Sequence, residues 1–174
     1  MSIELSKMPR LGFGLMRLPQ KDGSIDHERV CSMVDAYMKA GFYYFDTAYI
    51  YHGGLSEVEA REAVVKRYPR GSFYLADKLP AWVLKCEDDR DKVFNEQLER
   101  TGAEYFDFYL LHSVEDGGNC DTYERLKCFE WGVRKKAEGK IRHFGFSFHG
   151  TPALLERLLD EHPEVEFEIG RAHV

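Results

Sequence analysis

The feature that most limits the fold of this chain is a regular alternation of short apolar runs with amphipathic segments. Such alternation predicts a parallel sheet covered by helices, because a helix must carry the chain back before the next parallel strand can begin. Five runs read as strands, and a sixth begins at the "VEF" run. The expected strands are residues 11–16, 42–47, 72–78, 105–112 and 141–148, with the sixth opening near residue 165.

The segments between these runs carry helix signals at their ends. Gly41 is expected to end the first helix, a helix is expected around residues 90–100, and one continuous helix is expected from the Asp121 region to Gly139. The residues expected to cap helix starts are Asp26, Ser56 paired with Glu59, Asp121 paired with Glu124, and Thr151 followed by Pro152.

Polar or small residues recur at or near the ends of the expected strands. They are Gly14, Asp46, Lys78, His112 and Ser147, spaced 32 to 35 residues apart. Strand ends of this kind converge on one face of a βα-barrel, whereas a doubly wound sheet uses mainly the loops at one switch point. A full barrel needs about 250 residues, and this chain has 174. We therefore predict an α/β fold, an incomplete TIM (β/α)8 barrel with about five strands and five helices plus the start of strand six.

Composition excludes several classes of function. A net charge of −6 argues against a nucleic-acid partner, and no apolar run approaches the length of a membrane span. The N-terminus has no signal-peptide pattern. The cysteines are scattered without zinc-site spacing, so no metal site and a reduced, cytoplasmic protein are expected. They are Cys31, Cys86, Cys120 and Cys128. The oligomeric state is left open.

Four polar residues at the expected strand ends suit one kind of chemistry. A tyrosine is a weak acid with a pKa of about 10, and the ammonium of Lys78 would stabilise the phenolate of Tyr51 and lower that pKa. Asp46 could pair with Lys78, and His112 could donate a hydrogen bond to a substrate oxygen. Together these groups predict protonation of an oxygen as a carbonyl is reduced to an alcohol.

The chain resembles the aldo-keto reductase family through "LGFGLMRLP", "FDTAYIY", "ADKLP", "FDFYLLH" and "GFSFHG", in that order. The resemblance implies an eight-stranded barrel that binds NADPH, or sometimes NADH, and reduces small aldehyde or ketone substrates. It assigns Tyr51 as the proton donor, Lys78 and Asp46 as the pair that sets the pKa of this donor, and His112 as the residue that orients the substrate.

The resemblance also implies which residues contact the cofactor. Many family members have Ser-Asn where this chain has Ser147-Phe148, so the following His149 is a candidate for the amide contact. The cofactor contacts expected are Leu15, Met16, Arg17, Asp46, Ser147 and His149. "YHGGLSE", "ERTGAEYFDFYLLH" and "SFHGTP" are similar to a bacterial branch that often carries a C-terminal iron–sulfur segment. Such a cluster would belong to a part of the parent protein absent from this sequence.

Two other functions stay open. A metal-dependent barrel hydrolase could use Asp46, His112 and His149 as ligands, but it would leave Lys78 and Tyr51 without a role. A reductase-like module could instead sense the nicotinamide cofactor without turnover.

The last seven residues, "EIGRAHV", depart from the strand pattern. They can be encoded by the sequence of a common short-read sequencing adapter. We therefore expect residues 1–167 to be the N-terminal part of a reductase barrel and residues 168–174 to be a non-native tail. A partial barrel has two open sheet edges. The chain alone is therefore predicted to be unstable or to aggregate, to bind NADPH weakly and to be inactive, with the function belonging to the parent protein.

Overall fold

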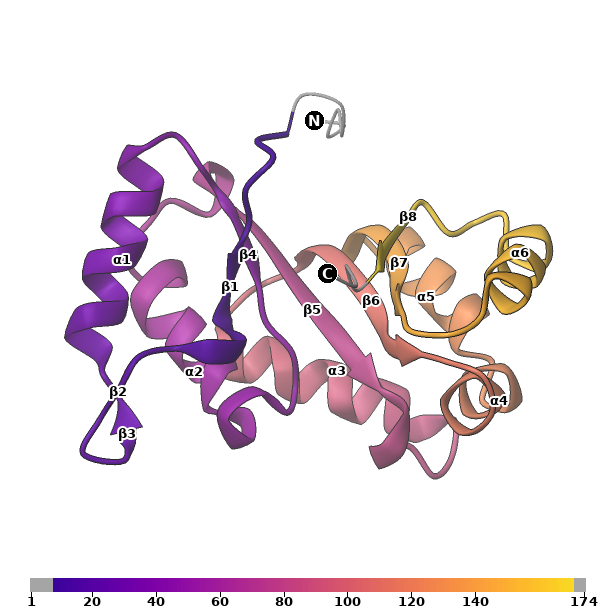
Figure 1. Ribbon diagram of the computed structural model, residues 1–174. Helices are drawn as coiled ribbons and strands as arrows, with labels where there is room; N and C mark the ends of the chain where they lie inside the picture. The colour runs from indigo at the N-terminus through magenta and orange to yellow at the C-terminus, as the bar shows by residue number, and fades with distance from the viewer. Residues whose placement is uncertain (1–7, 171–174) are drawn as a thin grey trace.

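The expected alternation of strands and helices forms one curved sheet. The computed structural model describes residues 8–170. Each strand of the sheet pairs in parallel with the strand before it, so the sheet grows in one direction (Figure 1). The six strands, in spatial order, are β1 (Phe13–Gly14), β4 (Tyr44–Asp46), β5 (Tyr74–Pro80), β6 (Phe106–Val114), β7 (Ile141–Phe148) and β8 (Phe167–Gly170).

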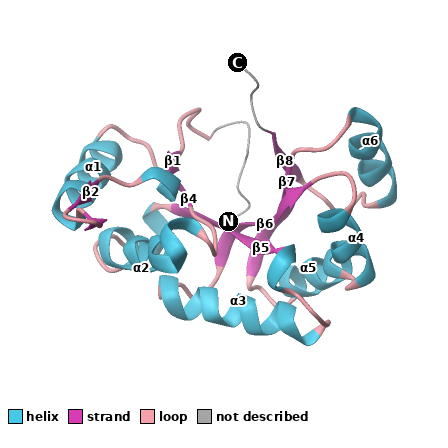
Figure 2. Ribbon diagram, turned by 60° about the horizontal axis from the view of Figure 1, so that its bottom comes forward, coloured by secondary structure: helices cyan, strands magenta, loops and turns pink. Residues whose placement is uncertain are grey.

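The helices cover the convex side of this sheet, and the concave side faces the interior of the partial barrel (Figure 2). The fold class predicted from the sequence is therefore confirmed. No helix among residues 8–170 is both long and apolar enough to cross a bilayer. The helices are α1 (His27–Lys39), α2 (Leu55–Ala60, continued by a π-helical turn at Arg61–Val65), α3 (Asp88–Thr101), α4 (Gly118–Arg125), α5 (Cys128–Ala137) and α6 (Pro152–Glu161).

The main core lies between the convex face of the sheet and the helices. At its centre the ring of Phe94 on α3 packs edge-on against Tyr109 of β6 at 5.0 Å and against Trp131 of α5 at 5.5 Å, both measured between ring centroids. All three side chains are almost completely buried. Aromatic pairs in this geometry contribute about 0.5–1.5 kcal/mol beyond their buried area, so they fix α3 and α5 against β6.

Gly132 of α5 lies directly against the Phe144 ring of the sheet. A Cβ atom at this position would overlap the ring of Phe144 on β7. The Gly132→Ala variant is expected to lose about 1–3 kcal/mol of stability, because overpacking a rigid core outweighs the better helix propensity of alanine. Urea denaturation would measure this loss. Gly118→Ala in α4 is the matched control because it has open space, and an equal loss in both variants would contradict the packing argument.

Two of the four expected helix caps, Asp26 and Thr151, are confirmed, and two, Ser56 and Asp121, are wrong. The side chain of Asp26 accepts a hydrogen bond from the Arg29 amide, and that of Thr151 accepts one from the Leu154 amide. Ser56 does not cap α2, which already begins at Leu55. Its hydroxyl instead bonds to the Thr47 hydroxyl at 2.7 Å and donates to the Leu15 carbonyl, while Glu59 contacts His27. The hydroxyl thus joins the ends of two strands.

The single helix expected after Asp121 is also wrong, because the chain forms α4 and α5 with a break between them. α4 begins before Asp121, at Gly118, and Lys127 adopts a left-handed conformation with φ of 49°. The guanidinium of Arg90, which is buried, donates to the Leu126 carbonyl and, at 2.9 Å, to the Lys127 carbonyl. Arg90 therefore provides a donor to the Leu126 carbonyl at the break, while the Lys127 carbonyl also accepts from the Trp131 amide of α5.

β8 continues past the point where the strand pattern was expected to end. Its residues pair with β7 from Gly145 opposite Phe167 to Phe148 opposite Gly170. Residues 168–170 therefore continue the strand, whereas the strand pattern was expected to end after Phe167. The foreign origin of residues 168–174 stays a prediction, and residues 171–174 lie outside the described part of the chain.

Candidate active site

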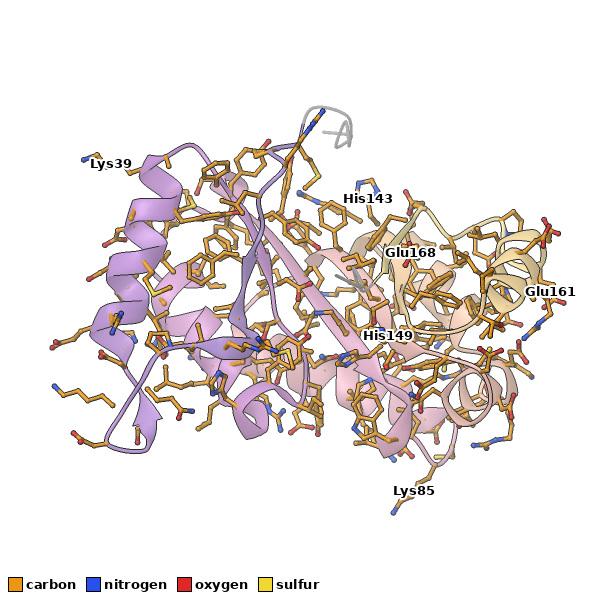
Figure 3. All side chains as sticks on the ribbon, in the orientation of Figure 1. Lys39, Lys85, His143, His149, Glu161 and Glu168 are labelled. Carbon is orange, nitrogen blue, oxygen red and sulfur yellow. The ribbon has the colours of Figure 1, made fainter. Side chains whose placement is uncertain are left out.

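A cavity of about 610 Å³ lies at the carboxyl ends of the strands. Figure 3 labels His149, which follows β7 and lies among the side chains gathered at this end of the sheet. Residues from β1, β4, β5, β6 and β7 contribute to the wall, as the strand-end pattern predicted. The polar and charged side chains of the lining are Arg17, Asp46, Tyr51, Lys78, His112, Ser147 and His149.

Lys78 is buried at this cavity and held from two sides. Its Nζ atom lies 2.5 Å from Asp46 Oδ1 and donates to the Thr47 carbonyl at 2.7 Å. Burial alone would lower the pKa of Lys78, but the charge and hydrogen bond of Asp46, together with Tyr51 and Asp77, more than offset it, and the pKa lies above its ordinary value. Lys78 is therefore a charged ammonium at neutral pH.

Tyr51 follows β4 and begins the short 3₁₀ turn Tyr51–Gly54. The Nζ atom of Lys78 lies 5.0 Å from the centroid of the Tyr51 ring, and the ring of His112 packs edge-on at 5.9 Å. Burial raises the pKa of Tyr51, and the charge of Lys78 opposes that rise without cancelling it. The lowering by Lys78 expected from the sequence is thus present, but burial exceeds it.

His112 is uncharged in this environment. Burial, together with the nearby positive charge of Lys78, lowers the pKa of His112 to about 3. A neutral imidazole donates from one ring nitrogen and accepts at the other. Trp82, which follows β5, packs against the His112 ring at 5.2 Å and is 45% exposed. Trp82 was not among the expected site residues, although a tryptophan four residues after Lys78 was a usable signal.

Five of the six expected cofactor contacts line the cavity, and the sixth does not. Leu15 is fully buried in the hydrophobic core, where the chain leaves β1. Ser147 Oγ accepts a hydrogen bond from the Ser113 amide at 2.7 Å, so its own O–H remains available to donate. The contacts at the cavity are Met16, Arg17, Asp46, Ser147 and His149.

Metal binding finds no support in the described part of the chain. No group of three His, Cys, Asp or Glu side chains among residues 8–170 is arranged to hold a metal ion. Asp46, one of the ligands that a hydrolase would need, is paired with Lys78 instead. The hydrolase alternative therefore has no ligand set here.

The model of the aldo/keto reductase family matches residues 10–170, which is almost all of the chain. The chain belongs to the aldo/keto reductase family. Aldehyde reductase YPR1 of Saccharomyces cerevisiae is 33% identical over 177 aligned residues, which cover 87% of this chain and 53% of the yeast protein. The NAD/NADP-dependent indole-3-acetaldehyde reductase of Schizosaccharomyces pombe is 33% identical over 108 residues, or 61% of this chain and 35% of that protein.

A solved structure of the same family has a similar fold. The crystal structure of an aldo/keto reductase from Brucella melitensis superposes with a TM-score of 0.72 at 26% identity, covering 95% of this chain and 59% of that one. The chain spans about half the length of the curated relatives it matches.

Proposed function

We propose that this chain supplies the proton-donor site of an NAD(P)H-dependent oxidoreductase that reduces aldehyde and ketone carbonyls to alcohols. The observation that carries the proposal is the arrangement of Asp46, Tyr51, Lys78 and His112 around one cavity. The names of the yeast relatives, an aldehyde reductase and an indole-3-acetaldehyde reductase, support the reaction class.

Each of the four residues has a distinct task in the proposed reaction. A bound nicotinamide supplies the hydride for the carbonyl carbon. Tyr51 donates its proton to the carbonyl oxygen, and the ammonium of Lys78 stabilises the phenolate that remains. Asp46 keeps Lys78 charged and oriented. His112, neutral because of its low pKa, donates a hydrogen bond to the same oxygen and holds the carbonyl in place.

Met16, Arg17, Asp46, Ser147 and His149 would hold the nicotinamide end of the cofactor. The hydroxyl of Ser147 is free to donate to the amide oxygen, and Met16 offers an apolar contact to the ring. We propose NADPH as the usual cofactor and NADH as a second, since one relative is named for both. A cytoplasmic location, and an iron–sulfur segment in a longer parent protein, stay predictions from the sequence.

The function is tested by adding NADPH and a panel of aldehydes to the purified protein and following nicotinamide oxidation. Oxidation that depends on the aldehyde supports a reductase. Binding of NADPH without oxidation would support the sensing module instead. The assay should compare the 174-residue chain with the longest product of its reading frame, established by long-read sequencing across codon 167. Weak NADPH binding by the shorter chain is expected from its open sheet edges.

Trp82 is expected to set preference for substrates with an aromatic group. It lies exposed beside His112, where the side chain of an aldehyde would extend from the carbonyl. An aromatic contact is worth about 0.5–1.5 kcal/mol. Trp82→Ala should therefore raise KM for an aromatic aldehyde by about 3- to 10-fold, with little change for a short aliphatic one. Trp82→Phe is the matched control and should retain most of the preference. An equal change for both substrates would contradict this role.

A further inference from the structure

Two buried carboxyl groups lie directly behind the cavity. Asp77 precedes Lys78 on β5, and because side chains alternate along a strand it points to the opposite face of the sheet. Glu57 reaches the same place from α2. Both residues are completely buried. Ionised carboxylates are rarely buried without a partner for each charge, so this pair requires an explanation.

Asp77 and Gln97 together bind both backbone polar groups of Lys78. Asp77 Oδ1 accepts from the Lys78 amide at 2.8 Å and from Gln97 Nε2 at 2.8 Å. Gln97 Nε2 also donates to the Lys78 carbonyl at 3.0 Å, and Gln97 Oε1 accepts from the Tyr109 hydroxyl at 2.5 Å. Because the Lys78 carbonyl can only accept, it fixes which end of the Gln97 amide faces Lys78, and Gln97 Oε1 then accepts from Tyr109.

The side chains of Asp77 and Gln97 make the backbone hydrogen bonds that a neighbouring strand would otherwise make with Lys78. The pairing of β4 with β5 ends where Asp46 lies opposite Ala76, and the Ala76 carbonyl accepts from the Thr47 amide. Lys78 lies two residues further along β5, beyond the end of that pairing. Buried backbone groups need hydrogen-bond partners. Asp77 and Gln97 supply these partners to the amide and carbonyl of Lys78, beyond the point where β4 ends.

One oxygen of each carboxyl has no donor among the described residues. These atoms are Asp77 Oδ2 and Glu57 Oε1, and both are buried. The two carboxyl groups lie within hydrogen-bonding reach of one another. Two ionised groups in this position would repel, whereas a single proton between them makes a hydrogen bond.

The surrounding charges decide which group keeps the proton. Glu57 Oε2 accepts from the Arg100 guanidinium at 3.0 Å, so Glu57 has a cation. Asp77 has only neutral donors, and burial followed by the charge of Glu57 raises its pKa well above the ordinary value. Two titratable groups face the pair from its own side of the sheet: Arg100 of α3 and Tyr109 of β6. Arg100 also forms an ion pair with Glu96. On the other side of the sheet lie Lys78, Asp46 and Tyr51.

We propose that Asp77 and Glu57 share one proton, carried on Asp77 Oδ2 and donated to Glu57 Oε1, and that the neutral Asp77 is a positioning residue for Lys78. The protonation rests on the burial of both carboxyl groups, their unpartnered oxygens and their proximity, and not on the function proposed for the site. The positioning role rests in addition on the function proposed for Lys78. Asparagine matches a protonated aspartate at this position, because its carbonyl accepts from the Lys78 amide and its NH₂ donates to Glu57.

The protonation is tested by infrared spectroscopy and thermal melting of the chain. The parent chain should show the carbonyl stretch of a buried, protonated carboxylic acid, and Asp77→Asn should lose it. The melting temperature of Asp77→Asn should stay within about 2 °C of the parent. Glu57→Gln should melt about 10 °C lower, because Arg100 loses the buried carboxylate of its two acidic partners and keeps only Glu96. A missing band in the parent, a band that persists in Asp77→Asn, or equal destabilisation of both variants would overturn the assignment.

The positioning role is tested by turnover in the protein that carries the chain. Asp77→Ala should lower kcat by about 10-fold or more, since misplacing a reacting group by about 1 Å can cost 100-fold, while Asp77→Asn should restore it. The alkaline limb of the pH–rate profile should be unchanged in Asp77→Asn, because no charge is removed near Tyr51. A shift of that limb, or full activity in Asp77→Ala, would overturn the proposal.

Gln97→Met provides the second variant if Asp77→Ala does not fold. It removes the donor to the Lys78 carbonyl and should also lower kcat, and full activity in this variant would overturn the positioning role. The infrared and melting results do not depend on turnover. A parent protein with the acid band and no reductase activity would therefore contradict the proposed function while the shared proton stands.

Discussion

Replacing Tyr51 with phenylalanine is expected to lower the rate of carbonyl reduction by about 10²- to 10⁴-fold, the usual contribution of a positioned general acid. The variant keeps the ring that packs against His112 and removes only the hydroxyl. Lys78 stays paired with Asp46, so the cavity keeps its shape and charge. The affinity for NADPH should therefore change little, and the loss should fall on kcat.

Steady-state kinetics with one aldehyde, together with a fluorescence titration of NADPH, would measure both quantities. Tyr49→Phe is the matched control, because Tyr49 lies two residues earlier and donates its hydroxyl to Glu96 outside the cavity lining. It should retain nearly full activity. If Tyr51→Phe kept more than about a tenth of the parent rate, or if Tyr49→Phe lost as much, the proton donor would have to be another group.

Removing the carboxylate of Asp107 is expected to cause the largest loss of stability. Asp107 is completely buried near the start of β6, and its oxygens lie 2.7 Å from Arg70 Nη2 and 2.8 Å from Arg142 Nη1. One oxygen also accepts from the Leu75 amide at 2.9 Å. Both guanidiniums lie over the Tyr105 ring, with Cζ 3.9 and 4.1 Å from its centroid. Asp107→Ala removes the carboxylate shared by two cations and an amide, leaving Arg70 only the carbonyls of Phe73 and Tyr105, and should cost about 3–5 kcal/mol.

Urea denaturation followed by circular dichroism would measure this loss. Asp91→Ala is the control, because Asp91 also pairs with two cations, Arg134 and Lys135, but its side chain is 38% exposed. Exposed ion pairs contribute little, so the control should lose much less stability. Equal losses would show that burial does not distinguish the two sites. Tyr105→Leu, which removes the ring beneath both guanidiniums, should lose less than Asp107→Ala because the ion pairs remain.

The positions of the strands and their parallel α/β arrangement were predictable because they depend on local periodicity. The break between α4 and α5 was not, since it depends on Arg90, which lies 37 residues before Lys127. A small hairpin, β2 (Gln20–Lys21) with β3 (Ser24–Ile25), was missed although its signal is local. Asp22 and Gly23 both adopt positive φ, as Asp-Gly commonly does in such turns. Ser56 and Glu59 matched a capping pattern, but tertiary contacts took up both side chains.

For the site, strand ends were a good guide to groups that face the cavity. They bring Asp46, Lys78, His112 and Ser147 to one wall. Leu15 shows the limit of this reasoning, because a residue just after a strand can turn into the core. Asp77 was missed because the strand-end pattern considers only the face of β5 that carries Lys78, and Asp77 points to the opposite face of the sheet. Two successive charged residues in a buried strand were a readable sign that both faces carry polar groups.

The order in which the strands pair has a consequence for synthesis on the ribosome. Each strand of the main sheet pairs with the preceding one, so every new βα unit can dock on structure that has already emerged. Asp46, Tyr51, Lys78 and His112 all lie on or just after the second to fourth strands of this series. The nascent chain can therefore bring these four side chains together before the later strands leave the exit tunnel.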